Sequence, residues 1–165
     1  MNRLALISNS PCETEELGQR LGSILTRGMF IALRGELGSG KTCFTRGVVA
    51  TAAPQSAQMV ASPTFAIMNE YPGEIPIYHF DFYRLSSCHE IAELGFEEYF
   101  QDDGICIAEW SERLGELLPP NYLGITFEHA GDDQRHIIFE ANDPETKSLL
   151  TRFATFEKPV KFSLT

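Results

Sequence analysis

Gly35-Glu36-Leu37-Gly38-Ser39-Gly40-Lys41-Thr42 is the stretch of the chain that decides its fold. It matches G-x-x-x-x-G-K-[ST] at every fixed position, the pattern of a loop that surrounds nucleotide phosphates with backbone N–H groups. Its glycines allow backbone conformations closed to residues with a Cβ, so successive amides can point inward. In such a loop the lysine reaches the β- and γ-phosphates, and the threonine hydroxyl binds Mg²⁺.

The flanking residues supply the strand and the helix that this loop requires. Met29-Phe30-Ile31-Ala32-Leu33 is an unbroken apolar run, typical of a strand buried on both faces. After the loop, Phe44, Val48, Val49 and Ala52 recur at helical spacing. The helix therefore starts at the loop, where its partly positive N-terminus faces the phosphates. A glycine-rich turn that matched the phosphate-loop pattern by chance would not be expected to have a buried strand before it and a helix after it.

Further helices and strands are expected along the rest of the chain. Ser10-Pro11-Cys12-Glu13 has the order of a capping box, although Thr14 is an alternative cap, and Gly28 ends that helix. A short helix follows Ser87, and a last helix starts at Asp143-Pro144. Strands are expected at residues 3–7 and 105–108, with antiparallel hairpins formed by residues 65–70 with 77–82 and by the segments on either side of residues 131–133.

Size and composition fit one compact domain. The chain has 165 residues, 43% of them hydrophobic, enough for one core and too few for two. We expect this domain to span residues 1–155, followed by a tail of unknown role over residues 156–165. Four scattered cysteines argue against zinc and indicate reduced thiols, although an even count also allows disulfides. The apolar run at residues 4–7 is too short for a signal peptide or a membrane span, so we expect a cytoplasmic protein with no membrane association.

The charge of the chain restricts its partners. Thirteen Lys and Arg against twenty-three Asp and Glu give a net charge of −10. A negative net charge disfavours binding of a nucleic-acid backbone by this chain alone, and the sequence has no basic run. The acidity either serves solubility or forms a docking face for a basic partner.

Two acidic residues stand out by their position. Glu109 directly follows the strand at residues 105–108, and an acid at that end of a strand holds Mg²⁺ or orients water in phosphate-loop enzymes. Its alternative role is that of an acid at the N-terminus of the next helix. Period two puts His79, Asp81 and Tyr83 on one side of their strand, so Asp81 is a candidate for placing an attacking water. The alternative for Asp81 is the solvent-facing side of an edge strand.

Other features are ambiguous from the sequence. Ser62-Pro63-Thr64-Phe65 lies where nucleotide-sensing loops occur, but it is also ordinary loop chemistry. His79 is more typical of a structural histidine than of a base. Trp110, the only tryptophan, adjoins Glu109, but a core aromatic is its commoner role. The spacing around Arg135 by itself indicates a surface charge.

Taken in order, the motifs resemble one family. They are Thr14 with Leu17-Gly18, the phosphate loop, Ser62-Pro63-Thr64-Phe65, His79-Phe80-Asp81-Phe82-Tyr83-Arg84-Leu85, Leu94-Gly95 and Glu109-Trp110. This set is similar to the pattern of the TsaE (YjeE) family, bacterial ATPases required for forming threonylcarbamoyladenosine in tRNA. The resemblance covers about residues 8–135 and is specific, because phosphate loops are common and this order of motifs is not.

The resemblance implies a fold, a reaction and partners. The fold is the α/β P-loop NTPase fold, with a mostly parallel central sheet, antiparallel hairpins and flanking helices. The reaction is ATP binding and hydrolysis, weak in the isolated chain and stimulated by the TsaB and TsaD proteins. TsaD transfers the threonylcarbamoyl group, so tRNA would be met only through the complex.

The resemblance also implies residue roles. Lys41 and the loop residues Gly35, Glu36, Leu37, Gly38, Ser39 and Gly40 would bind phosphates, and Thr42 and Glu109 would hold Mg²⁺. Asp81 would be essential to hydrolysis, Arg135 would lie near the nucleotide, and the segment from Ser10 to Thr14 would border the adenine. Glu36 departs from the aspartate usual in the family, which is a conservative change, and the tail matches nothing known.

Two other classes compete with an ATPase. A small P-loop kinase would need an arginine-rich lid, and the sequence has no arginine cluster between Lys41 and Arg135. A nucleotide-sensing interaction module would look much the same in sequence, because weak turnover leaves no separate motif. A GTPase would need an N-K-x-D segment, which the sequence lacks.

Overall fold

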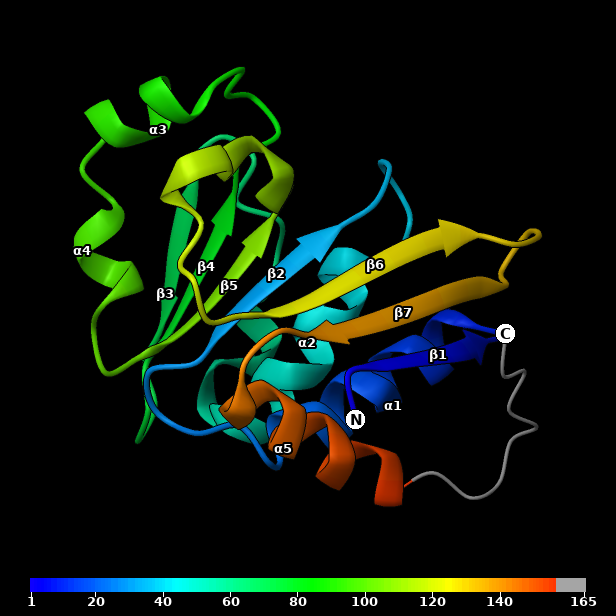
Figure 1. Cartoon of the computed structure of the whole chain (residues 1–165). Coiled ribbons are helices and arrows are strands. Elements are labelled where there is room, and N and C mark those ends of the chain that lie inside the picture. The colour runs from blue at the N-terminus through cyan, green and yellow to red at the C-terminus, as the bar shows by residue number, and fades with distance from the viewer. Residues whose placement is uncertain (157–165) are drawn as a thin grey trace.

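The computed structural model describes residues 1–156, so the predicted tail lies almost wholly outside the described residues. The described chain forms a seven-stranded sheet in the order β1-β7-β6-β2-β5-β4-β3 (Figure 1). The strands are β1 (Arg3–Ser8), β2 (Phe30–Arg34), β3 (Met68–Tyr71), β4 (Ile77–Asp81), β5 (Ile105–Glu109), β6 (Leu123–His129) and β7 (Arg135–Ala141).

The centre of this sheet is parallel and its outer parts are antiparallel. Strand β2 pairs in parallel with both β5 and β6, and β4 pairs in parallel with β5. The hairpins β3–β4 and β6–β7 are antiparallel, as is the pairing of β1 with β7. The expected P-loop NTPase fold, with a mostly parallel central sheet and two antiparallel hairpins, is confirmed.

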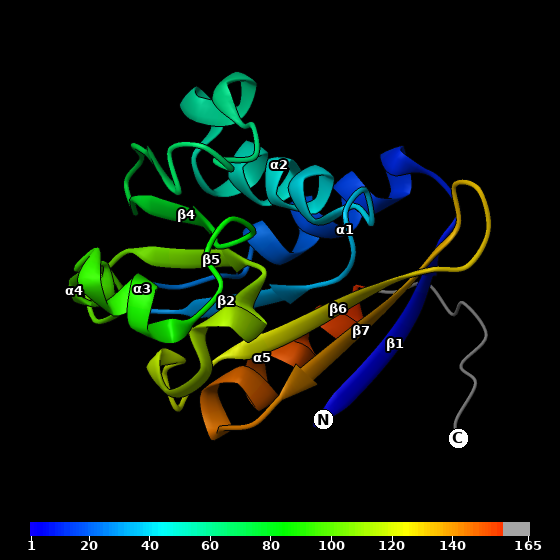
Figure 2. The same cartoon turned by 90° about the horizontal axis from the view of Figure 1, so that it is seen from above.

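Helices cover both faces of the sheet (Figure 2). They are α1 (Pro11–Gly22), α2 (Lys41–Ala52), α3 (Cys88–Glu93), α4 (Glu97–Phe100) and α5 (Pro144–Thr155), with 3₁₀ turns η1 (Pro54–Met59) and η2 (Ser111–Leu117). Alternate residues of β2 enter two different hydrophobic clusters. Ile31 and Leu33 pack with residues of α1, α2 and α5, whereas Phe30 and Ala32 pack with residues of α3, α4 and η2. The unbroken apolar run of β2 therefore serves two cores, one on each face.

Several predicted element boundaries are wrong. Helix α1 ends at Gly22, because the Ser23 backbone caps it, while Gly28 sits in the later turn with φ +80°. The strand expected from residue 65 begins at Met68, since the Ile67 amide bonds back to the Pro63 carbonyl and closes a turn that leaves Phe65 84% exposed. The partner strand β4 ends at Asp81, one residue early. The short elements η1 and α4 were not expected.

Helices α1 and α2 approach each other closely through three glycines, Gly18, Gly22 and Gly47. A Cβ added to Gly47 would lie 2.0 Å from the Glu15 carbonyl oxygen, and one added to Gly18 would lie 2.1 Å from the Phe44 carbonyl oxygen. Both distances are far below van der Waals contact. This contact holds the start of α1 against the start of α2, where the phosphate loop ends.

None of the helices found in residues 1–156 combines the length and the hydrophobicity that a membrane-spanning helix needs.

We expect Gly47→Ala to lower the free energy of unfolding by about 1–3 kcal/mol, because its methyl group overpacks the α1–α2 contact. Helix propensity alone would make the alanine variant more stable by about 1 kcal/mol. A loss of unfolding free energy would therefore indicate the packing effect, and a gain would indicate helix propensity. Urea unfolding measures the difference, and Thr51→Ala on the exposed side of α2 is the control. A Gly47→Ala protein more stable than the unmodified chain would contradict this account of the helix contact.

Candidate functional site

A cavity of about 390 Å³ opens where β2, β4 and β5 end and α2 begins. Ligands of open α/β sheets bind at this carboxyl edge. Asp81 is the last residue of β4 and Glu109 the last of β5, and the phosphate loop leaves the end of β2. The cavity wall contains Lys41, Thr42, Asp81 and Glu109 together.

The phosphate loop holds its lysine in a buried position. Helix α2 starts at Lys41, and Gly40 before it has φ +108°, a conformation that favours glycine. Lys41 is only 4% exposed, and its ammonium donates to the carbonyl oxygens of Gly35 and Glu36 and lies 4.7 Å from the ring centroid of Trp110. Burial lowers the pKa of Lys41, against the opposing effect of nearby acids, Glu109 first. The site therefore contains a buried cation held by the carbonyl groups of the phosphate loop.

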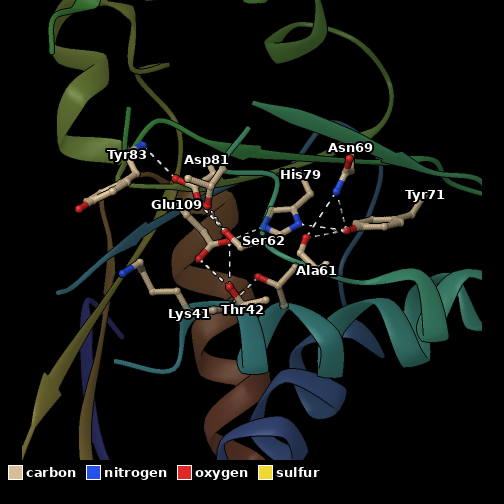
Figure 3. Close-up of polar contacts among 12 residues, drawn as sticks. Lys41, Thr42, Ala61, Ser62, Asn69, Tyr71, His79, Asp81, Tyr83 and Glu109 are labelled. Atoms are coloured by element: carbon tan, nitrogen blue, oxygen red, sulfur yellow. Dashed lines mark hydrogen bonds and ion pairs between the residues drawn. The ribbon is translucent and has the colours of Figure 1, made fainter. Parts of the chain in front are cut away.

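Glu109 connects the loop to the sheet (Figure 3). Its carboxylate accepts from the Thr42 hydroxyl, at 3.1 Å to Oε1 and 3.3 Å to Oε2. His79 Nε2 lies 2.6 Å from Glu109 Oε2, and both side chains are buried. Glu109 is thus a strand-end acid that faces the phosphate loop, and the alternative role at a helix N-terminus is wrong.

Asp81 is held by the segment that precedes β3. Its Oδ2 accepts from the hydroxyls of Ser62 and Thr64, and its Oδ1 accepts from the Tyr83 amide at 2.9 Å. Asp81 is 3% exposed, and β4 lies between β3 and β5. The alternative of a solvent-facing acid on an edge strand is therefore wrong. Tyr83 lies beyond the end of β4 and packs on Trp110.

Arg135, the first residue of β7, lines the cavity and bonds to the phosphate loop. Its guanidinium donates to the carbonyl oxygens of Ser39 at 3.2 Å and Gly38 at 3.3 Å, and to carbonyls of the β6–β7 turn. Arg135 is half-buried and bonded to the phosphate loop, a contact that its spacing in the sequence did not predict, because the fold brings β7 beside the loop.

The start of α1 forms another part of the wall. Pro11 and Thr14 line the cavity, and buried Thr14 bonds to the Ser8 hydroxyl at 2.7 Å. Ser10 caps α1 by accepting from the Glu13 amide, so it is the cap that the sequence suggested. Among the predicted binding residues, the wall does not include Ser10, Gly35 or Glu36.

Sequence reasoning left several residues of this site undecided or unnamed. Ser62, Thr64 and Trp110 line the cavity, and His79 supports Glu109 from behind. The period-two pattern of β4 did place His79 on the side of Asp81. Ser62 and Asp81 are 19 residues apart, so no local pattern joins them. Cys43 and Asp133 also line the cavity, and no sequence signal pointed to them.

A glycine-rich loop between a buried parallel strand and a helix, with acids at the ends of the next two strands of the sheet, β5 and β4, defines the P-loop NTPase class. The chain belongs to one family of that class. The model of the family described as "Threonylcarbamoyl adenosine biosynthesis protein TsaE" matches residues 8–137, which confirms the resemblance expected from the motifs. TsaE proteins take part in forming threonylcarbamoyladenosine in tRNA.

Individual relatives agree with this assignment. The tRNA threonylcarbamoyladenosine biosynthesis protein TsaE of Bacillus subtilis is 38% identical over 142 residues, which are 86% of this chain and 87% of the relative. The protein of the same name from Treponema pallidum is 34% identical over 131 residues, 79% of this chain and 96% of its own. The crystal structure of Bacillus subtilis YdiB superposes with a TM-score of 0.77 and 32% identity, covering 93% of this chain and 95% of that one.

We expect Arg135→Ala to loosen the phosphate loop, because it removes the donors that bond the Gly38 and Ser39 carbonyls. Hydrogen exchange followed by mass spectrometry should show severalfold faster exchange in peptides covering residues 36–40, with α5 unchanged. Arg3→Ala, which removes an exposed guanidinium 4.0 Å from Glu140, is the matched control. Equal loop protection in both variants would show that Arg135 does not brace the loop.

Proposed function

We propose that this protein binds and hydrolyses MgATP and thereby supports formation of N6-threonylcarbamoyladenosine in tRNA together with TsaB and TsaD. The observation that carries the proposal is the meeting of Lys41, Thr42, Asp81 and Glu109 in the wall of one cavity. Membership of the TsaE family supports the pathway, and the site chemistry supports the reaction.

The residues present suit a magnesium ion. Mg²⁺ prefers hard oxygen ligands and is held by one or two protein groups together with phosphates. The Thr42 hydroxyl and the Glu109 carboxylate form such a set, because their oxygens lie within 3.1–3.3 Å of each other at the N-terminus of α2. A bound ion would neutralise charge on the β- and γ-phosphates. Lys41 would add its charge from the loop side.

Asp81 is suited to orienting water. Three donors fix its carboxylate, the Ser62 and Thr64 hydroxyls at Oδ2 and the Tyr83 amide at Oδ1, so its direction is set before a substrate binds. A carboxylate fixed in this way accepts a hydrogen bond from a water molecule and aligns it with the γ-phosphate. Because the Thr42 hydroxyl bonds to Glu109, we assign Glu109 to the metal and Asp81 to hydrolysis.

The nucleotide would extend from the phosphate loop toward α1 and β7. We propose that Ser10, Thr14 and the residues between them border the adenine, since Pro11 and Thr14 line that side of the cavity. The loop residues from Gly35 to Gly40 would surround the phosphates, and Arg135 would lie near them.

The cavity wall favours water over another acceptor of the phosphoryl group. Its basic side chains are Lys41 and Arg135, and Arg135 is already engaged by loop carbonyls. A kinase uses several additional cations to hold a phosphate acceptor and to close a lid over it. This composition therefore supports an ATPase more than a small P-loop kinase.

The charge of the chain supports a role through partners. A net charge of −10 disfavours independent binding of tRNA. TsaB and TsaD, which the family resemblance implies, would therefore bring this ATPase to the modification reaction. Contact with them would also raise the slow turnover expected of the isolated chain.

We expect substitutions of Asp81 and Glu109 to have different effects on binding and turnover. Asp81→Asn should bind MgATP within about twofold of the unmodified chain yet lose turnover by about 10²-fold or more, because only the alignment of water is lost. Glu109→Ala should also lose the Mg²⁺ dependence of binding. Calorimetric titration with and without Mg²⁺, together with phosphate release, measures both. Full turnover in Asp81→Asn would remove that residue from the mechanism.

We expect Lys41→Ala to reduce threonylcarbamoyladenosine formation over many turnovers in a reaction reconstituted with TsaB, TsaD and tRNA, while a single transfer by TsaD is less affected. Lys147→Ala on α5, away from the cavity, is the matched control. If Lys41→Ala supports as many turnovers as the unmodified chain, ATP hydrolysis here serves another purpose. Phosphate that appears on an added acceptor, and not free in solution, would favour the kinase.

A further inference from the structure

A chain of buried polar groups runs from the edge strand β3 to the phosphate loop (Figure 3). The Tyr71 hydroxyl lies 3.2 Å from His79 Nδ1, His79 Nε2 lies 2.6 Å from Glu109 Oε2, and the Thr42 hydroxyl donates to Glu109. Tyr71 is 1% exposed and His79 is fully buried, so water does not substitute for these contacts. The chain links a residue outside the cavity wall to the carboxylate assigned to the metal.

The register of the β3–β4 hairpin builds this chain. His79 lies directly opposite Asn69, and Tyr71, two residues along the same face of β3, is its diagonal neighbour. The Tyr71 and His79 rings are 5.9 Å apart between centroids. Because side chains alternate along a strand, the face that carries His79 also carries Asp81 at the cavity.

The contacts of His79 determine which ring nitrogen carries the proton. The Glu109 carboxylate accepts from Thr42, and at 2.6 Å it requires a donor from the imidazole as well. Nε2 must therefore carry the hydrogen, and in a neutral imidazole Nδ1 is then an acceptor. Tyr71 is the side chain placed to donate to Nδ1.

Two further observations direct the Tyr71 proton to His79. Burial raises the pKa of Tyr71 above its ordinary value, so the hydroxyl stays protonated. The Ala61 carbonyl oxygen is a second acceptor, 3.4 Å from the Tyr71 oxygen, but His79 Nδ1 is closer at 3.2 Å. The Asn69 side-chain amide donates to the Tyr71 hydroxyl oxygen, at 3.5 Å, which leaves the hydrogen of that hydroxyl free to be donated.

We propose that Tyr71 is a positioning residue of the site: its hydroxyl donates to Nδ1 of His79 and so fixes the ring orientation in which Nε2–H holds Glu109 toward Thr42. This inference rests on the proposed function for its consequence, because a correctly directed Glu109 matters for Mg²⁺. Hydrogen-bond partners behind a metal ligand typically change metal affinity or activity by about 10–100-fold when they are removed.

The first test observes the ring nitrogens of His79 directly, without nucleotide or metal. The chain has four histidines, and ¹⁵N spectra of their imidazoles distinguish Nδ1–H from Nε2–H, with the His79 signal assigned from its loss in His79→Gln. The unmodified chain should show the Nε2–H tautomer. Tyr71→Phe should keep Nε2–H, because Glu109 still requires that donor, but the resonance of the unprotonated Nδ1 should shift as it loses the Tyr71 hydrogen bond. An unchanged Nδ1 resonance in Tyr71→Phe would overturn the proposal, even if the protein proved not to be an ATPase.

The second test follows Mg²⁺. Tyr71→Phe should raise the Mg²⁺ concentration at half-saturation for binding a non-hydrolysable ATP analogue by about tenfold, the low end expected for a supporting group. Binding without Mg²⁺ should stay unchanged. Tyr78→Phe is the matched control, because this buried tyrosine of β4 donates to Asp102, outside the cavity. Equal effects of the two variants on the Mg²⁺ requirement would overturn the proposal.

Variants of His79 distinguish positioning from general support of the fold. Glutamine places its amide nitrogen near the position of Nε2 and needs no tautomer, so His79→Gln should retain most of the Mg²⁺ response. Asparagine places its amide near Nδ1, so His79→Asn should lose that response.

Combining the two substitutions tests whether Tyr71 acts through His79. Adding Tyr71→Phe to His79→Gln should change the half-saturating Mg²⁺ concentration by less than about twofold, since coupled residues are not additive. A full tenfold effect of Tyr71→Phe in the His79→Gln background would show that Tyr71 acts by another route and would overturn the proposal. Failure of the unmodified chain to bind ATP would overturn the proposed function and leave the ¹⁵N result for His79 standing.

Discussion

Three buried charges in one cavity are the constraint on which the structure depends. Lys41, Asp81 and Glu109 are 4%, 3% and 3% exposed. Charged groups removed from water are costly unless they are paired and hydrogen-bonded. Each of the three has its own support: loop carbonyls for Lys41, two hydroxyls and an amide for Asp81, and Thr42 with His79 for Glu109. The site is therefore formed before any ligand enters it.

The fold brings the two acidic charges close together, because the ends of neighbouring strands lie side by side. Strands β4 and β5 pair in parallel, so Asp81 and Glu109 are direct neighbours in register. Neighbouring like charges repel, and each of the two carboxylates is held by its own donors. Serine and threonine of one segment approach Asp81, while α2 brings Thr42 to Glu109. The glycine contact between α1 and α2 completes the arrangement, because it fixes the helix that presents Thr42.

The sequence predicted the parts whose signals are local. The phosphate loop, the buried strand before it and the acid that ends β5 each follow from a short pattern, and both hairpins follow from alternation around turn residues. The unpredicted parts depend on contacts distant in sequence. Ser62 meets Asp81 and Arg135 meets Ser39 only after the sheet has formed, across 19 and 96 residues. The end of α1 was misplaced for a related reason: Ile24 and Leu25 are buried like helix residues, but they lie in the turn that follows Gly22.

The central claim is that this cavity holds MgATP with the metal between the loop and the end of β5. Its most direct test is a crystal structure with a non-hydrolysable ATP analogue and Mn²⁺ in place of Mg²⁺, in which anomalous scattering locates the metal. The account predicts a metal peak beside Thr42 and Glu109, phosphates within the loop from Gly35 to Lys41, and adenine near Pro11 and Thr14. A nucleotide bound outside the cavity, or a metal peak remote from both Thr42 and Glu109, would contradict it.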